Sequence, residues 1–224
     1  PSNVFATLNP LSSLNGQNTF SYGNNRCVTN SGTHPGSLST LGLSSGKYYY
    51  EAKITTGSNT SRKYAVVGIT DNPQEDTMSE IGEDNYSAII YMDTGQKRIN
   101  GSLTSYGVGF DFGDIVGVFI DLDNSKLYFS KNGVVMNSGT GMDITPVANT
   151  NSGFYFAGAG DWDNSASYTW DLNFGNGCFG NTQLTGTTYN GSDGNGIFKY
   201  NPNNITLDGS SKSFKSISTK GLNL

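Results

Sequence analysis

The stretch GDIVGVFIDLDNSKLYFSKNGVVM, residues 113–136, decides the fold class of this chain. Three apolar runs alternate in it with two polar turns: the runs cover residues 115–120, 126–130 and 134–136, and the turns cover 123–125 and 132–133. The second turn is Asn132-Gly133, a pair that adopts positive φ at low cost and so matches the twist of paired strands. The stretch therefore predicts three antiparallel strands in a meander.

Two further segments alternate with period two, which is typical of strands that are buried on one face. In residues 167–174 the large apolar side chains all fall on one face, which we expect to lie in the core: Tyr168, Trp170, Leu172 and Phe174. Residues 47–54 place Tyr48, Tyr50, Ala52 and Ile54 on an expected core face. The other face, with Lys47, Tyr49, Glu51 and Lys53, is expected to face water.

Shorter runs complete the strand pattern. We expect strands at residues 64–69, 86–91, 144–148 and 154–157, and loops at residues 71–85 and 101–113. Short strands separated by turns, without an apolar stripe at helical spacing, predict two packed antiparallel sheets. The fold class is therefore an all-β, two-sheet antiparallel sandwich of the jelly-roll type.

Composition sets limits on function. The chain has 224 residues, 14% of them charged against a typical ~25%, and a net charge of −5. An acidic chain disfavours nucleic-acid binding through a basic face. No window approaches the ~20 apolar residues of a membrane span, and the first residues lack the pattern of a secretory signal. A single large β domain fits this length.

Changes in composition predict three regions. Residues 1–45 are polar and rich in glycine, and we expect an N-terminal extension that packs on the sandwich. Residues 46–175 hold the clear strands. Residues 176–224 open with a stretch rich in Gly, Asn and Thr, and we expect an irregular C-terminal extension that packs on the sandwich or on a partner.

An ordered set of short motifs resembles the SPRY domain. The motifs are Gly46-Lys47-Tyr48-Tyr49-Tyr50-Glu51, Val67-Gly68-Ile69, Tyr86-Ser87, Gly113-Asp114 through Gly117-Val118, Asp121-Leu122-Asp123, Lys131-Asn132-Gly133, Pro146 and Asn173-Phe174-Gly175. This resemblance covers residues 46–175. It implies a concanavalin-like sandwich and a non-enzymatic recognition role carried by loops at its edges.

The segments that flank this region resemble those of SPRY-containing bacteriophage virion proteins. They are VFATLNP at residues 4–10 and FKSISTKGLNL at residues 214–224. This resemblance implies a virion location and a structural or attachment role in a capsid decoration or tail fibre. The partners would be other virion proteins or further copies of the chain.

The residues that usually carry catalysis are scarce. His34 is the only histidine and falls in a turn-like segment. Gly42-Leu43-Ser44-Ser45-Gly46 fits G-x-S-x-G, but that motif needs a strand before the serine and a helix after it. The few glutamates, Glu51, Glu75, Glu80 and Glu83, do not form a fixed pair of the glycosidase type. We therefore expect no enzyme activity and no cofactor.

Metal sites are not expected either. Neither Asp121 nor Asp161 starts a complete EF-hand loop, because position twelve is Asn132 or Leu172 rather than Glu. The two cysteines, Cys27 and Cys178, lack metal-type spacing. A disulfide between them and two separate thiols are both compatible with the sequence, and separate thiols are the preferred interpretation.

The alternative function is a lectin-like module that binds a host-surface glycan or receptor. Aromatic rings beside carboxylates can stack on a sugar and bond its hydroxyl groups. The candidate loop residues for partner or glycan binding are Asp84, Asn85, Tyr86, Tyr106, Asp161, Trp162 and Asp163. The competing interpretation of Trp162 is that it covers the edge of the sandwich.

Overall fold

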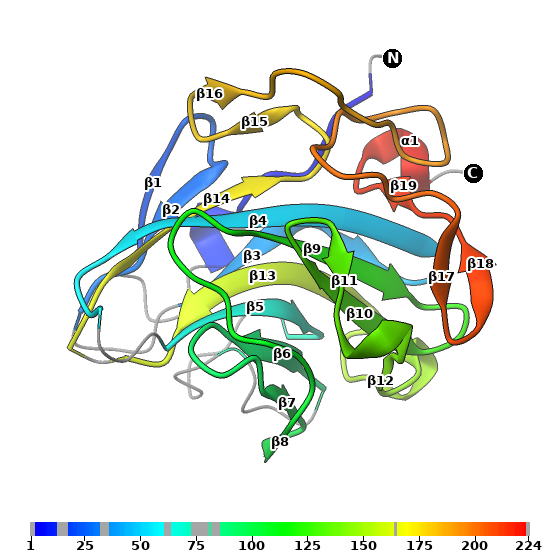
Figure 1. Ribbon diagram of the computed structural model, residues 1–224, viewed down its shortest axis with the longest axis horizontal. Coiled ribbons are helices and arrows are strands. Elements are labelled where there is room, and N and C mark those ends of the chain that lie inside the picture. The colour runs from blue at the N-terminus through cyan, green and yellow to red at the C-terminus, as the bar shows by residue number, and fades with distance from the viewer. Residues whose placement is uncertain are drawn as a thin grey trace.

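Two antiparallel sheets face each other in a computed structural model, which describes residues 3–12, 18–31, 36–60, 64–72, 81, 86–163 and 165–222. Figure 1 shows the larger sheet in the middle of the molecule and the smaller sheet below it, with the C-terminal segment above the larger sheet and, at β17 and β18, along its right-hand side. The predicted all-β sandwich is confirmed.

The larger sheet has nine strands. The order along its main path is β1-β2-β14-β4-β9-β10-β11, with β12 paired to β10 and β19 paired to β4. Their bounds are β1 Thr19–Ser21, β2 Arg26–Val28, β4 Lys47–Gly57, β9 Ile115–Asp121, β10 Lys126–Lys131, β11 Val134–Val135, β12 Met142–Asp143, β14 Tyr168–Asn173 and β19 Lys215–Ser216. Among the described strands of this sheet, β19 is the one that pairs in parallel, with Lys215 opposite Tyr48.

The smaller sheet has six strands in the order β3-β13-β5-β6-β7-β8. Their bounds are β3 Gly36–Leu43, β5 Ala65–Thr70, β6 Ala88–Tyr91, β7 Lys97–Ile99, β8 Ser102–Thr104 and β13 Tyr155–Asp161. Two small ribbons lie outside both sheets, β15 Cys178–Phe179 with β16 Thr182–Gln183, and β17 Ile205–Leu207 with β18 Ser210–Lys212. The short helices are η1 Pro10–Ser12, η3 Asn137–Gly139, η4 Val147–Asn149 and α1 Thr219–Leu222.

The core lies between the two sheets and contains the alternating residues that the sequence placed there. Trp170 and Tyr50 are fully buried, and both are tied to the opposite sheet by hydrogen bonds. Trp170 Nε1 donates to the Gly160 carbonyl at 3.1 Å, and the Tyr50 hydroxyl donates to the Gly68 carbonyl at 2.7 Å. These polar tips need partners because an unpaired buried donor costs about 1–3 kcal/mol.

The outer face of β4 differs from the sequence-based expectation. Tyr49 and Glu51 were expected to face water, yet both are fully buried. The C-terminal segment crosses this face and packs Phe198, Leu207 and Phe214 against Tyr49. The prediction of a wet face was therefore wrong at these two positions, because the residues that cover them lie far along the chain, between positions 198 and 214.

Other sequence-based boundaries need correction. The predicted strand at residues 144–148 is wrong, because Pro146 begins a turn that leads into η4. The region expected as an N-terminal extension supplies β1, β2 and β3, so it contributes strands to both sheets. The predicted loop at residues 101–113 contains β8, which follows the tight turn Asn100-Gly101 with φ of +49° and +77°.

Candidate functional site

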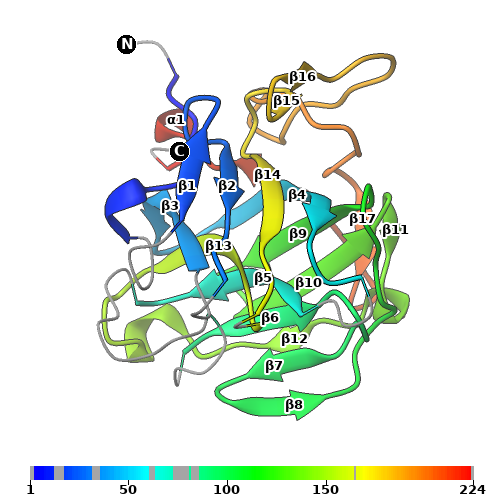
Figure 2. The same ribbon diagram turned by 90° about the vertical axis from the view of Figure 1, so that its left-hand side faces the viewer.

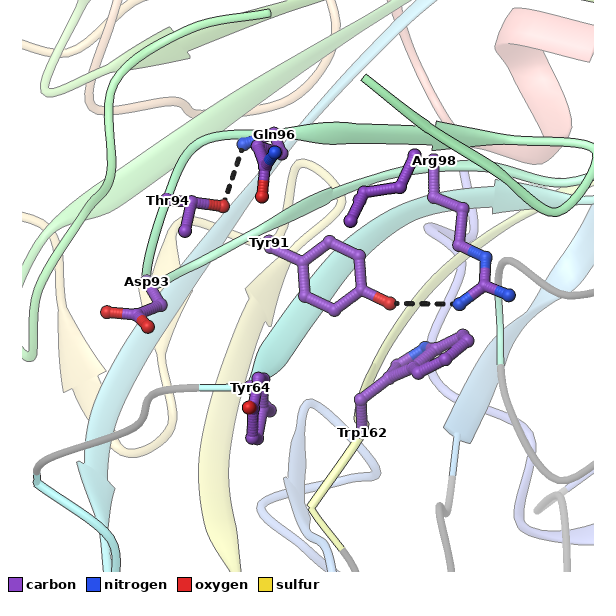
Figure 3. Close-up of a pocket in the computed structure, with 8 residues that line it drawn as sticks. Tyr64, Tyr91, Asp93, Thr94, Gln96, Arg98 and Trp162 are labelled. Atoms are coloured by element: carbon purple, nitrogen blue, oxygen red, sulfur yellow. Dashed lines mark hydrogen bonds between the residues drawn. The ribbon is translucent and has the colours of Figure 1, made fainter. Parts of the chain in front are cut away.

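A pocket of about 390 Å³ opens on the outer face of the six-stranded sheet, on the side away from the core. Strands β6, β7 and β8, the β6–β7 turn, and the segments beside β5 and β13 supply its walls. The residues that line it are Tyr64, Tyr91, Asp93, Thr94, Gln96, Arg98, Leu103 and Trp162. Figure 3 shows the Arg98 side chain reaching toward Trp162 and Tyr91.

The arginine and the tryptophan form one side of this pocket. The Arg98 guanidinium lies over the Trp162 ring with its carbon 3.9 Å from the ring centroid, a cation–π geometry. The Arg98 Nη1 donates to the Tyr91 hydroxyl at 3.4 Å, and Nε donates to the Gly101 carbonyl at 3.1 Å. These contacts hold the positive charge in a fixed orientation.

The rings beneath this charge are also held in place. Trp162 Nε1 donates to the Ile81 carbonyl at 3.0 Å, and the Trp162 ring meets Tyr91 edge to face at a centroid distance of 5.5 Å. Both rings pack on a small apolar cluster that contains Val66 and Ile89 on the outer face of the sheet. A pocket floor that is already packed loses little side-chain entropy when a ligand binds.

The opposite rim carries negative charge. Asp93 and Thr94 are exposed in the turn between β6 and β7, and the Thr94 hydroxyl accepts a hydrogen bond from the backbone N–H of Gln96 at 3.2 Å. The pocket therefore offers a cation at one end, a carboxylate at the other and aromatic surface between them. Such a site suits an amphipathic segment with both polar and apolar groups.

The structure separates the sequence-predicted site residues. Trp162 lines the pocket, and one face of its ring is covered by Arg98. Tyr106 is a correction, because only 7% of it is exposed and its ring packs edge to face on Phe129 in the core. Tyr86 is half-buried, and Asp84 and Asn85 lie outside the described residues.

The two aspartates beside Trp162 are buried and organise the chain there. Asp161 Oδ1 accepts the Asp163 amide at 3.1 Å, and Asp163 accepts the Asn59 side-chain amide at 2.7 Å and the Ser165 hydroxyl at 2.7 Å. These are the bonds of a structured turn that presents Trp162. Among the described residues, no three His, Cys, Asp or Glu side chains are grouped to hold a metal ion.

Sequence reasoning missed Arg98, Tyr91 and Leu103, which make up much of the pocket. Arg98 belongs to a pair, Lys97-Arg98, that resembles an ordinary solvated strand end, so charge alone gave no signal. The informative signal was the dipeptide Asn100-Gly101, since it predicts a hairpin that returns the chain beside Arg98.

On the outer face of the nine-stranded sheet, Glu51 is fully buried. This carboxylate accepts four hydrogen bonds: from the backbone N–H of Lys199 (3.0 Å) and Tyr200 (2.8 Å), the Asn173 side-chain amide (3.0 Å) and the Tyr49 hydroxyl (3.2 Å). Burial raises the pKa of Glu51 to about 7, although the four donors favour the ionised form. Glu51 thus anchors the C-terminal segment.

Two ion pairs with buried aspartates add to this: one joins the C-terminal segment to β9, and the other joins β2 to β14 within the nine-stranded sheet. Lys212 Nζ lies 2.9 Å from Oδ2 of the fully buried Asp121, which joins β18 to the end of β9. Arg26 Nε and Nη2 contact the two oxygens of the buried Asp171 at 2.6 and 2.7 Å. Such bidentate pairs fix geometry as well as energy.

Neither cysteine forms a disulfide. Cys27 is buried in the core, and its burial raises the pKa of its thiol to about 12. Cys178 is partly exposed in β15. The structure therefore confirms the preferred sequence-based interpretation, which was two separate thiols. Within the described ranges, no helix combines the length and apolar character needed to cross a bilayer.

Comparison with known proteins gives three results. Residues 47–155 match the family model of the SPRY domain. The chain is 31% identical over 98 residues to the ATP-dependent RNA helicase DDX1 of Xenopus laevis, covering 44% of this chain and 12% of the helicase. It is 31% identical over 107 residues to the probable ATP-dependent RNA helicase ddx1 of Dictyostelium discoideum, covering 48% and 13%. The chain thus spans about an eighth of these relatives.

Solved structures share the fold at low identity. The SPRY domain of human HERC1 has a TM-score of 0.60 and 16% identity, covering 74% of this chain and 96% of that one. The structure of stonustoxin has a TM-score of 0.52 and 20% identity, and the match covers 75% of this chain and 27% of the stonustoxin chain. The expected SPRY resemblance is therefore confirmed over residues 47–155, as a SPRY-like sandwich.

Proposed function

We propose that this chain is a non-catalytic protein-interaction module that binds a peptide segment of a partner protein in the pocket beside Arg98 and Trp162. SPRY domains are generally interaction modules without catalytic activity, which supports the class of function. The observation that carries the site is the pocket itself, with its fixed guanidinium, its aromatic floor and the carboxylate of Asp93 on the opposite rim.

The pocket favours a peptide over a sugar. A sugar ring needs a free aromatic face, and Arg98 occupies one face of Trp162 at 3.9 Å. Of the other two rings proposed for stacking, Tyr106 is buried and Tyr86 is half-buried. The lectin-like alternative therefore has less support from the described residues than binding of a peptide does.

The test is selection of binders from a library of random dodecapeptides, followed by affinity measurement on purified variants. We expect Arg98→Ala to weaken the selected peptides at least tenfold. Lys97→Ala is the matched control, since Lys97 is the neighbouring cation on β7 and does not line the pocket. Equal affinity for the wild type and Arg98→Ala would show that the pocket is not the site.

The proposed biological setting is a bacteriophage particle, in which the partner segment belongs to another virion protein. Support comes from the flanking sequences and from a surface with few charges, 14% of all residues. Mass spectrometry of purified particles should find the chain at a fixed stoichiometry. Absence of the chain from such particles would leave the peptide site standing but remove the virion role.

A further inference from the structure

Strand β8 ends the six-stranded sheet, and its outer edge is open in the part of the chain that the structure describes. All three of its residues are exposed, and Leu103 is 50% exposed. In Figure 2 β8 forms the lowest edge of the sheet, beyond β7. An open strand edge presents backbone donors and acceptors that can pair with another chain.

The hydrogen-bond pattern of the neighbouring strands shows which backbone groups point outward. Tyr91 N–H donates to the Gln96 carbonyl at 2.9 Å, and Asn100 N–H donates to the Ser87 carbonyl at 3.2 Å. Bonded and non-bonded pairs alternate along an antiparallel ladder, so the intervening pair Ile89 and Arg98 is also a bonded one. The backbone of Arg98 is thus directed to β6 and away from β8.

Leu103 lies opposite Arg98 across the β7–β8 ladder. Because Arg98 bonds to β6, the pair Arg98 and Leu103 is a non-bonded one, and the N–H and C=O of Leu103 point to the open edge. The two-residue turn Asn100-Gly101 leads to the same assignment of bonded and non-bonded pairs. The residues that flank it, Ile99 and Ser102, form the hydrogen-bonded pair next to the turn, so the next pair, Arg98 and Leu103, is non-bonded.

The side chain of Leu103 connects this edge with the pocket. Cross-strand partners share one face of a sheet, so Ile89, Arg98 and Leu103 form a row on the outer face. Leu103 and Arg98 both line the pocket. A strand added at ~4.8 Å beyond β8 would continue this row with the side chain that lies opposite Leu103.

We propose that the partner peptide binds as an extended strand antiparallel to β8, exchanging two backbone hydrogen bonds with Leu103 and directing the side chain opposite Leu103 toward the Arg98–Trp162 pocket. This inference rests on the proposed function, because it states how the peptide of that site is held. Backbone pairing supplies affinity, and the pocket selects the side chain.

A peptide fits the edge better than a second copy of the chain does. The edge is three residues long, so two copies paired through β8 alone would share few hydrogen bonds. A peptide can pair with Leu103 and at the same time fill the 390 Å³ beside it. The continuity of the edge with the pocket therefore points to one elongated binding surface.

The test is a scan of single N-methylated residues in a peptide selected from the dodecapeptide library. Only alternate N–H groups of an added strand face β8, so methylation should weaken binding at least tenfold at the residue opposite Leu103. Methylation of either residue beside it should weaken binding less than threefold, because those N–H groups point away from β8. A scan without this alternation would overturn strand addition.

Variants of the protein separate the two proposals. Leu103→Pro removes the outward N–H while keeping the bonds of β8 to β7, as prolines on edge strands do, and should weaken the peptide at least tenfold. Leu103→Ala also removes the side chain that lines the pocket but keeps that N–H, so the difference in affinity between the Pro and Ala variants measures the loss of the N–H. If Arg98→Ala weakens binding but neither N-methylation nor Leu103→Pro does, the pocket stands and strand addition fails. A dimer in light scattering that Leu103→Pro converts to monomer would assign the edge to a second copy and overturn the proposal.

Discussion

The two outer faces of the sandwich differ in whether another segment of the chain covers them. The face of the nine-stranded sheet is closed above β4 by the C-terminal segment, which buries Tyr49 and Glu51 completely. The face of the six-stranded sheet keeps a pocket in which Arg98 and Trp162 reach the surface. One face thus contributes to stability, and the other carries the pocket at which we propose that a partner binds, although both sheets share the same core.

The largest expected effect is on the closed face. Phe214→Ala removes a fully buried ring that packs edge to face on Phe119 and should lower the free energy of unfolding by about 3–5 kcal/mol, because it leaves a cavity. Phe154→Ala is the matched control, since this ring is 43% exposed and its loss should cost less than about 1 kcal/mol. Urea unfolding of the two variants checks the contrast, and equal losses would contradict a packed outer face.

The next effect concerns Glu51 and pH. Its pKa in the folded chain is about 7, above the ~4.3 of an unfolded glutamate, so the folded state binds more protons between these values. The contribution of Glu51 to the free energy of unfolding is therefore fully present below pH ~4 and is lost as the pH rises through 7. At ~1.4 kcal/mol per pH unit, the loss is on the order of 4 kcal/mol.

The difference in unfolding free energy between wild type and Glu51→Gln isolates this contribution from the other titrating groups. We expect the difference to change between pH 4.5 and 7 in favour of the variant and to be flat above pH 8. A difference that is flat over the whole range would mean that Glu51 is ionised at all these pH values. It would also mean that its four donors outweigh its burial.

A smaller effect is expected in thiol reactivity, which should differ between Cys27 in the core and Cys178 in the C-terminal segment. Cys27 is 1% exposed, and burial raises the pKa of its thiol to about 12, so its reactive thiolate is scarce at neutral pH. Cys178 is partly exposed in the C-terminal segment. Native protein should therefore react with a thiol reagent at Cys178 first, and equal rates would indicate that the core opens readily.

The smallest expected effect on stability is at the pocket on the outer face of the six-stranded sheet. Arg98→Ala removes a half-buried cation–π contact, which is worth about 0.5–1 kcal/mol at such a site. The same variant should weaken peptide binding at least tenfold, as stated above. A loss of stability above about 3 kcal/mol would instead make Arg98 a structural residue of the sheet.

The sandwich could be predicted from sequence because its signals are local. The alternation of residues 167–174 and the Asn132-Gly133 turn each fix a strand and its facing without reference to distant residues. The turn Asn100-Gly101 was equally local, yet the short strand after it has no apolar alternation. That strand was therefore assigned to a loop.

The candidate site was harder to predict because it is built from distant segments. Arg98 and Trp162 are 64 positions apart and become neighbours only through the strand order β13-β5-β6-β7. The burial of Glu51 depends on Lys199 and Tyr200 in the same way. Period-two alternation shows that a strand has two faces, but it does not show which outer face another segment will cover.

Side-chain footprinting by hydroxyl radicals, with mass spectrometry of the native protein, tests the contrast between the two faces most directly. Tyr49 and Phe119, at 0% and 2% exposure, should be protected, whereas Leu103 at 50% exposure should be modified rapidly. Trp162 should likewise be modified faster than the fully buried Trp170. Rapid modification of Tyr49 and Phe119 in the folded chain would contradict a closed outer face.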